Sequence, residues 1–144
     1  MRICIHMSLT ICTVVYNEEK NLSTIEHNIR VLRESAPSLQ FLLIDNGSND
    51  GSNEGLKKLT AQFGIEHLVR SKNHLPQARQ QALTTAKTQW VGFVDADCRI
   101  DERWVYCIQK RLLQNSAKTV AIGGPWTITG GDAPVYQGLF NYLP

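Results

Sequence analysis

Short hydrophobic runs alternate with stretches of helical periodicity along most of the chain. The first run, residues 9–16, is almost continuously apolar and β-branched and stops at Asn17. Such a run is typical of a strand buried on both faces of a sheet. Apolar residues then recur at helical spacing until Pro37, with Asn17 as the expected cap of this helix. The chain therefore opens with a predicted strand followed by a predicted helix.

The strand and helix pattern repeats further along the chain. Three apolar runs after the first are each followed by residues with a helical period, and Asp101 is the expected cap of the last helix. A short edge strand is expected at 126–129 in an otherwise irregular tail. This alternation predicts an α/β fold with three α/β/α layers and an open, mostly parallel sheet. The further strands are expected at residues 41–44, 65–69, 90–94 and 119–122.

Composition limits the class of protein. A chain of 144 residues with 42% hydrophobic and 19% charged residues is expected to form one domain, 1–144, with a sizeable core, residues 1–7 being a candidate extension. The formal charge of +2 indicates neither a nucleic-acid partner nor an anionic membrane. The four cysteines form no C-x-x-C pair, which favours a reduced, cytoplasmic chain. No apolar run reaches the roughly 20 residues of a membrane span.

The aspartates mark the expected site. Five of the six follow the second or fourth predicted strand, and open α/β sheets bind ligands at the carboxyl ends of their strands. Asp50 and Asp101 also suit a loop and a helix cap. Asp95 and Asp97 end a buried run, so we expect them on an extended segment, one facing a bound hydroxyl or sugar and the other a cation. Oxygen ligands favour Mg²⁺ or Mn²⁺.

Four segments, in this order, resemble the successive motifs of family-two glycosyltransferases of the GT-A fold. They are residues 13–19 (TVVYNEE), residues 45–52 (DNGSNDGS), Asn73 with Ala78-Arg79, and residues 93–97 (FVDAD). Each lies at the expected end of a strand or start of a helix, which makes the set far more specific than any one motif. The resemblance implies a Rossmann-like domain that binds a nucleotide-diphosphate sugar.

The resemblance also implies roles for individual residues. The loop after the first strand and the aspartate after the second would hold the base, Arg79 would lie near the base and the phosphates, and Asp95 would contact the ribose. Asp97 would hold the Mn²⁺ or Mg²⁺ ion that bridges the diphosphate. A solvated helix face is the alternative for Arg79, and the edge of the core is the alternative for Tyr16. The expected nucleotide-binding residues are Val15, Tyr16, Glu18, Asp45, Arg79 and Asp95.

By the same resemblance, the chain would take part in sugar transfer with inversion from a UDP- or GDP-sugar. The acceptor would be a saccharide, a lipid or a protein, in a setting such as cell-wall or polysaccharide biosynthesis. The expected location is the cytoplasm, including the inner membrane face. The apolar tail that contains Tyr136 and Phe140 would pack on the sheet, cover a partner such as a second copy, or mark where a longer chain was cut.

The chain departs from the family pattern in two ways. Val14, Asn46 and Leu75 stand where the family usually has proline, a second aspartate and glycine. The general base of inverting members lies well beyond the D-x-D motif, and Asp132 is the one acidic residue after Glu102. Asp132 is therefore a candidate base. The chain resembles an N-terminal portion of such an enzyme.

Two other functions stay open. The chain could bind a nucleotide sugar without transferring it, as a binding module or a remnant that lacks the base. Alternatively, Asp95 and Asp97 could be the nucleophile and acid of an aspartyl phosphatase, whose signature is also D-x-D after a strand. That signature normally follows the first strand of its domain and continues to Thr or Val, where this chain has Arg99.

Overall fold

The computed structural model describes residues 8–114, 121–122, 126–127 and 137–138. The chain divides into two compact units, Met1–Gln109 and Lys110–Pro144. In the second unit, β5 (Trp126–Thr127) and β6 (Gln137–Gly138) form an antiparallel pair. The first unit contains the sheet and the helices that pack on it, and all the predicted site residues except Asp132 belong to it. Asp132 lies outside the described residues.

The first unit is built on a four-stranded parallel sheet with the strand order β3-β2-β1-β4. β1 is central and pairs Val15 with Asp45 of β2 and Cys12 with Phe93 of β4. The carboxyl ends of the strands therefore meet at one edge, which we call the carboxyl edge. The strands are β1 (Leu9–Val15), β2 (Gln40–Asp45), β3 (Glu66–Val69) and β4 (Trp90–Phe93). The helices are η1 (Glu19–Asn21), α1 (Leu22–Ser35), α2 (Ser52–Phe63), α3 (Leu75–Thr85) and α4 (Glu102–Leu113).

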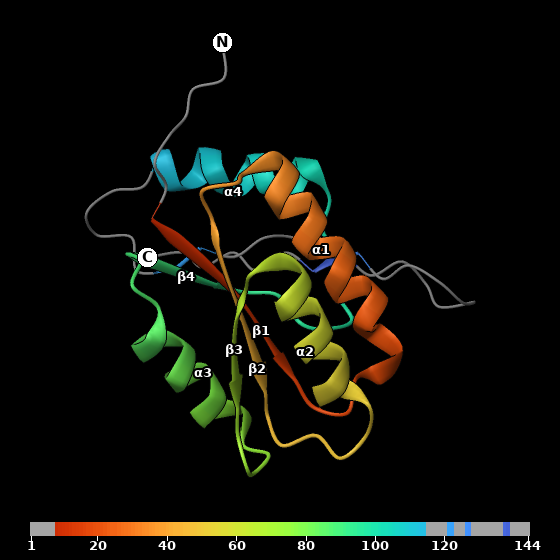
Figure 1. The fold of residues 1–144 in the computed structure, drawn as a ribbon. Coiled ribbons are helices and arrows are strands. Elements are labelled where there is room, and N and C mark those ends of the chain that lie inside the picture. Colours follow the sequence, from red (N-terminus) through yellow and green to blue (C-terminus); the bar gives the residue numbers. More distant parts are fainter. Residues whose placement is uncertain (1–7, 115–120, 123–125, 128–136, 139–144) are drawn as a thin grey trace. The chain divides into compact units, whose positions relative to one another are not determined.

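Helices cover both faces of the sheet, which confirms the predicted three-layer α/β architecture. Figure 1 shows α1 and α2 on one face and α3 on the other. Ala78 and Ala82 of α3 are fully buried against Cys12, Leu42 and Ile44. Small residues at this helical spacing let α3 lie close to the strands, as the sequence indicates.

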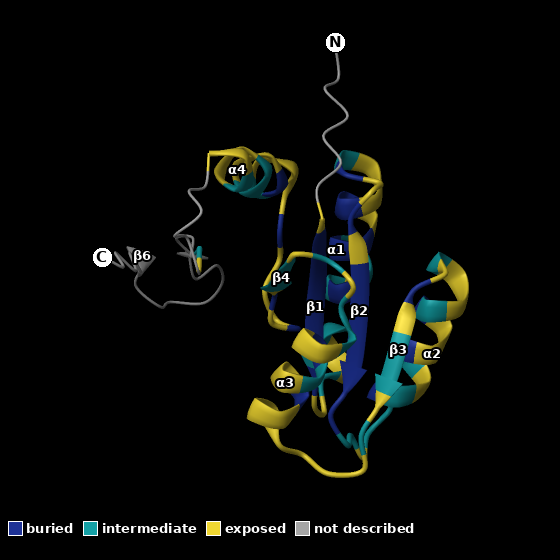
Figure 2. Cartoon of the chain, turned by 90° about the vertical axis from the view of Figure 1, so that its left-hand side faces the viewer, coloured by how far each residue is buried: buried dark blue, intermediate teal, exposed yellow. Residues whose placement is uncertain are grey.

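Burial is greatest along the two central strands. Ile11, Leu43 and Ile44 are at most 1% exposed. Figure 2 shows β1 and β2 buried along most of their length, whereas β3 and β4 are intermediate or exposed. The continuous hydrophobic runs of β1 and β2 are thus explained by contact with helices on both faces.

Several predicted boundaries differ from the structure. β1 ends at Val15, and Asn17 does not cap a helix: it has a φ of 55°, and α1 begins only at Leu22, after η1. Asp101 is confirmed as a cap, because its Oδ1 accepts the Trp104 N–H at 2.7 Å. In the predicted strand 119–122, residues 121–122 have no regular structure and the rest lies outside the described residues.

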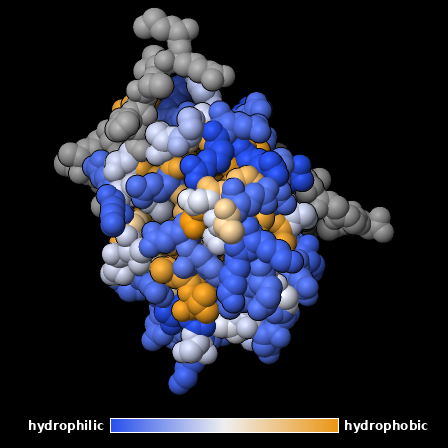
Figure 3. All heavy atoms as spheres, in the orientation of Figure 1, coloured by the Kyte–Doolittle hydropathy of each residue, from blue (hydrophilic) through white to orange (hydrophobic). Residues whose placement is uncertain are grey.

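Some large apolar side chains reach the surface. Val69, Leu75 and Leu83 are between 42% and 55% exposed. The face drawn in Figure 3 is mainly hydrophilic, with apolar areas separated by polar ones. Scattered apolar exposure of this kind is ordinary for a folded domain. Among the described helices, none is both long enough and apolar enough to cross a membrane.

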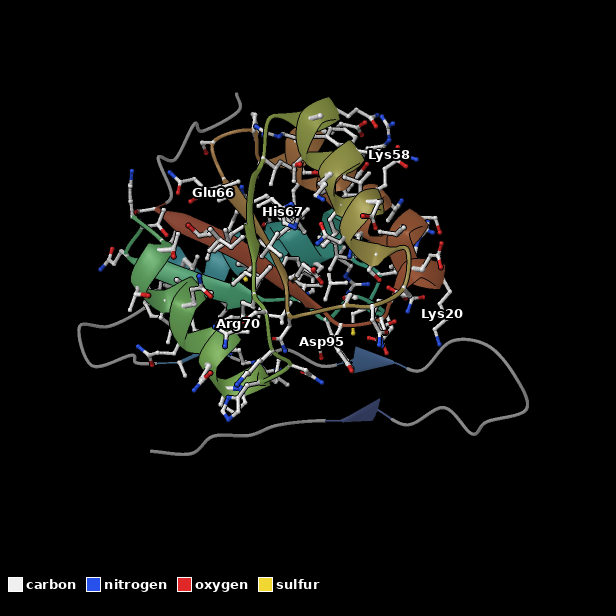
Figure 4. The ribbon with its side chains drawn as sticks, turned by 60° about the horizontal axis from the view of Figure 1, so that its bottom comes forward. Lys20, Lys58, Glu66, His67, Arg70 and Asp95 are labelled. Carbon is white, nitrogen blue, oxygen red and sulfur yellow. The ribbon has the colours of Figure 1, made fainter. Side chains whose placement is uncertain are left out.

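His67 on β3 is expected to make stability depend on pH. Burial lowers the pKa of His67 below its ordinary 6.5, Asp45 opposes this effect, and Lys57 adds to it. Its Nε2 is buried without a hydrogen-bond partner, and Figure 4 shows the side chain between the sheet and α2. His67 is therefore protonated more readily in the unfolded chain than in the native protein. As a result, the free energy of unfolding falls as the pH drops through 6.5.

Urea unfolding at pH 7.5 and pH 5.5 tests this expectation. The loss of stability between these two values should be smaller in His67→Gln, which has no proton to gain, than in the unaltered chain. Equal losses of stability in both proteins would show that His67 does not contribute to the pH dependence of stability.

Candidate functional site

The loops that follow β1 and β2 are joined by hydrogen bonds at the carboxyl edge. Three consecutive backbone N–H groups after β1 donate to side chains of the second loop, and one bond runs in return. The left-handed backbone at Asn17 turns these N–H groups toward the second loop, and short polar side chains tolerate that conformation. The bonds are Asn17 N to Ser48 Oγ (3.0 Å), Glu18 N to Ser52 Oγ (2.8 Å), Glu19 N to Asp50 Oδ2 (3.2 Å) and Asn49 N to Asn17 Oδ1 (2.9 Å).

Asp50 belongs to the hydrogen bonds that join these two loops rather than to an open site. Its Oδ1 accepts the Ser52 N–H at 2.9 Å, next to the start of α2. Hydrogen bonding to Ser52 lowers the pKa of the Asp50 carboxyl below its ordinary 3.8. The loop role that the sequence allows for Asp50 is therefore the one that the structure supports.

Val15 and Asp45 are the last residues of β1 and β2, where the joined loops begin. Asp45 is 1% exposed, and its Oδ1 accepts the Ser48 N–H at 3.1 Å. The Val15 side chain is fully buried, and its carbonyl accepts the Asn46 N–H at 2.7 Å. Gly47 follows with a φ of +85°, and a Cβ there would lie 3.1 Å from the backbone of Lys72. This turn therefore requires glycine.

Tyr16 and Glu18 belong to the loop that follows β1. Tyr16 is 41% exposed, which argues against its alternative role at the edge of the core. Glu18 is half-buried, and its Oε2 accepts from Asn21 Nδ2 at 2.6 Å. The aromatic ring is therefore accessible at the carboxyl edge, whereas the Glu18 carboxylate already has one local partner.

Asn46 organises the neighbouring loop between β3 and α3. It is 1% exposed, and its Oδ1 accepts from Arg70 Nε at 3.0 Å and from the His74 N–H at 3.3 Å. Its Nδ2 donates to Asn73 Oδ1 at 2.8 Å. Arg70 also donates to Oε1 of Gln81 and Gln77 on α3, at 3.0 and 2.9 Å. The Asn46 amide thus makes three hydrogen bonds within the protein.

The D-x-D segment is a turn, which corrects the expectation of an extended segment. β4 ends at Phe93, and the Cys98 N–H donates to the Asp95 carbonyl at 3.0 Å. Asp95 and Asp97 are exposed, whereas Val94 and Ala96 are buried. The buried residues hold the turn against the protein, and both carboxylates face solvent.

Arg79 lies beside this turn. Its guanidinium is 3.6 Å from Asp95 Oδ1, and its Cζ is 5.7 Å from the centre of the Phe93 ring. Two predicted nucleotide-binding residues, one on α3 and one after β4, are thereby brought together. Figure 4 looks toward the carboxyl edge and labels Asp95 and Arg70 there. An exposed ion pair contributes little stability, so the arrangement leaves the guanidinium available to an anion.

The D-x-D turn suits a hard divalent cation bound together with a substrate. In the described residues, no group of three or more His, Cys, Asp or Glu side chains is placed to hold a metal. Mg²⁺ and Mn²⁺ are commonly held by one or two carboxylates, with phosphate oxygens and water as the other ligands. Cys98 is a poor ligand here, since burial first, then Asp97 and Asp95, raise the pKa of its thiol.

A cavity lies at the opposite, amino edge of the sheet. It has a volume of about 370 Å³ and is lined by residues that include Gln40, Gly64, Glu66 and Lys87. None of the predicted site residues that the structure describes lines it. The joined loops, Arg79 and the D-x-D turn all lie at the carboxyl ends of the strands, so the two locations can be separated by experiment.

The sequence matches the model of glycosyl transferase family 2 over residues 10–140. The chain belongs to this family. Two relatives from Streptococcus pneumoniae serotype 4 (strain ATCC BAA-334 / TIGR4), the glycosyltransferases GlyG and GlyA, are each 23% identical to it. Each alignment covers 89% of the chain but 42% of GlyG and 18% of GlyA. The chain therefore spans less than half the length of these two relatives.

Solved structures confirm the GT-A fold. S. aureus TarS 1-349 in complex with UDP superposes with a TM-score of 0.60 at 19% identity, over 72% of this chain and 31% of that one. The same protein in complex with UDP-GlcNAc gives 0.60 at 20% identity, over 72% and 30%. Membership of glycosyl transferase family 2 argues against the aspartyl phosphatase alternative.

Sequence reasoning missed two residues that support the site. Arg70 lies in a polar loop, and only the three side chains that converge on it reveal its role. Asn28 occupies a core position of α1 between Ile25 and Ile29, and a polar residue on that apolar face was the available signal.

Proposed function

We propose that the carboxyl edge binds the nucleoside diphosphate of a nucleotide sugar together with Mn²⁺ or Mg²⁺, and that the chain supplies the donor-binding part of an inverting glycosyltransferase. The main support is the proximity of Arg79 to Asp95, with Asp97 two residues further along the same exposed turn. Family membership and the complexes of TarS with UDP and UDP-GlcNAc make a nucleotide sugar the natural ligand class.

The nucleobase would lie over the joined loops. The exposed ring of Tyr16 offers a stacking surface, and the backbone around Val15 and Glu18 would line the pocket. Asp45 uses one of its lone pairs on Ser48, and a carboxylate has about four, so it keeps capacity to accept from a base. Asp95 would accept from the ribose.

Charge develops on the diphosphate as the sugar leaves. Arg79 can donate two parallel N–H bonds to phosphate oxygens, which is a strong and directional contact. Asp97 would hold the divalent cation, which when bound stabilises the negative charge of the leaving group without a proton transfer. Transfer with inversion also needs a base within hydrogen-bond reach of the acceptor hydroxyl, and Asp132 is the candidate in this chain.

A thermal-shift titration tests the proposal. The melting temperature of the chain is measured with UDP, GDP, CDP and dTDP, each with and without Mn²⁺. Ligand at about 100 times its Kd stabilises the native state by about 2.7 kcal/mol, a shift of several degrees in a domain of this size. We expect one nucleotide to raise the melting temperature, and more so with Mn²⁺. No shift with any of the four would contradict the proposal.

Replacing Arg79 with methionine should weaken nucleotide binding at least tenfold, because a hydrogen bond to a charged group contributes about 1.5–3 kcal/mol. The matched control is Arg30→Met. Arg30 also pairs with a carboxylate, Glu26, and lies over a phenylalanine ring, Phe63, but on α1. Calorimetric titration with UDP and Mn²⁺ should give an unchanged Kd for the control. An equal loss in both variants would refute a phosphate contact at Arg79.

Binding without transfer is the alternative. The alignments reach only 42% of GlyG and 18% of GlyA, so most of each relative has no counterpart in the aligned region. Transfer of sugar to any acceptor by this chain would exclude the alternative, and binding without turnover would favour it.

A further inference from the structure

The inner face of α1 carries one polar side chain in its apolar stripe. Asn28 is 2% exposed and lies at helical spacing between Ile25 and Leu32, next to Ile29, and these three residues are at most 3% exposed. An amide in such surroundings costs free energy unless its donor and acceptor groups are paired. The partners of Asn28 therefore indicate why a polar residue stands there.

Both ends of the Asn28 amide are bonded to the segment that directly follows the D-x-D turn. Its Nδ2 donates to the Cys98 carbonyl at 2.7 Å, and its Oδ1 accepts the Ile100 N–H at 3.0 Å. Residues 98–100 have no regular secondary structure, so these backbone groups have no helix or strand partner. The side chain thus acts in place of a neighbouring strand.

His27, the adjacent residue of α1, binds the same segment. Its Nε2 lies 3.1 Å from the Ile100 carbonyl and its Nδ1 lies 3.1 Å from a guanidinium nitrogen of Arg99. A carbonyl only accepts and a guanidinium only donates, so the proton is on Nε2 and Nδ1 accepts. His27 is half-buried and Arg99 is exposed, whereas the two Asn28 bonds involve a buried side chain. Asn28 is therefore the better protected of the two anchors.

The D-x-D turn is consequently fixed at both of its ends. Before the turn, the Val94 N–H donates to the Cys12 carbonyl of β1 at 3.1 Å. After the turn, Cys98 and Ile100 are held by Asn28. Asp97 lies between these two anchors and immediately precedes Cys98, so the direction in which its carboxylate points depends on where Cys98 is held.

We propose that Asn28 is a positioning residue for the metal-binding carboxylate. By holding the backbone of Cys98 and Ile100, it keeps Asp97 oriented toward a cation bound to the nucleoside diphosphate. The inference rests on the proposed function, which makes Asp97 the metal ligand. It adds a residue of α1 that touches neither nucleotide nor metal but sets how much the metal improves nucleotide binding.

The test compares nucleotide affinity with and without metal. The Kd of UDP, and of GDP if UDP does not bind, is measured by calorimetry for Asn28→Ala in Mn²⁺ and again in EDTA. We expect the Mn²⁺-dependent gain in affinity to fall about tenfold, while the affinity in EDTA changes less than twofold. Asn28→Asp keeps the volume and the acceptor for Ile100 but sets a carboxylate oxygen against the Cys98 carbonyl, so the Mn²⁺-dependent gain should fall at least as much.

The control is Ile29→Ala, which creates a cavity on the same inner face of α1 without touching the turn. It should lower the melting temperature and leave the Mn²⁺-dependent gain unchanged. A gain that is unchanged in Asn28→Ala, or lost equally in Ile29→Ala, would overturn the positioning role. If Asn28→Ala does not fold, Asn28→Asp decides by the same comparison. Failure of the proposed function would show instead in the unaltered chain, as no binding of UDP, GDP, CDP or dTDP, and would overturn both.

Discussion

Replacing Asp97 with alanine is expected to remove the metal-dependent part of nucleotide binding and to leave the fold intact. Asp97 is exposed on a turn whose buried residues are Val94 and Ala96, so its side chain contributes little to packing. Asp97 is the carboxylate of the turn that we assign to the cation, whereas Asp95 pairs with Arg79, so the replacement removes the proposed protein ligand. We expect the Kd of UDP in Mn²⁺ to rise at least tenfold, to the value measured in EDTA.

Two further variants make this result specific. Asp97→Asn keeps the shape but removes the charge, and should behave like Asp97→Ala. Glu34→Gln removes an exposed carboxylate from the end of α1 and should bind as the unaltered chain does. If Asp97→Ala responded to Mn²⁺ like the unaltered chain, the metal would have to be held elsewhere.

The second large effect is expected at Asn46. Replacing it with leucine removes the buried partner of Arg70 Nε, the His74 N–H and Asn73 Oδ1, groups that belong to half-buried or exposed residues. A hydrogen bond contributes about 0.5–1.5 kcal/mol net, so the loss of three should lower the free energy of unfolding by about 2–4 kcal/mol. Urea unfolding measures the loss, and nucleotide binding should weaken because the loop before α3 is released.

Asn46→Asp is the informative comparison, since the resemblance to family-two glycosyltransferases implies aspartate at this position. A carboxylate still accepts from Arg70 and His74, with a charge-assisted bond to the guanidinium, and loses only the donation to Asn73. We expect its stability to lie within about 1 kcal/mol of the unaltered chain. A loss in Asn46→Leu no greater than in Asn46→Asp would show that these hydrogen bonds do not hold the loop.

The sequence predicts the layers of the fold because they depend on periodicity. The runs that became β1 and β2 are continuously apolar since helices cover both faces, and the Ala78 and Ala82 spacing identifies the inner face of α3. The start of α1 could not be predicted the same way. Asn17 suits a helix cap by type, but its bonds to the 45–52 loop hold it in a left-handed conformation instead.

The sequence marks those candidate residues whose proposed role rests on their own side-chain chemistry. Asp95, Asp97 and Arg79 are exposed at the carboxyl edge, and a motif in the sequence marks each of them. Asn28 and Arg70 act through residues 72 and 24 positions away, at the Ile100 N–H and Asn46 Oδ1. Such contacts depend on tertiary packing, which local sequence patterns do not report.

Amide chemical-shift mapping tests the central claim most directly. Spectra of the labelled chain are recorded with UDP and Mg²⁺, with the other three nucleoside diphosphates as further probes. We predict that the largest shifts fall on residues 45–52, on Arg79 and on residues 95–98, at the carboxyl edge. Shifts concentrated instead around Gly64 and Lys87, which line the cavity at the amino edge, would contradict the account.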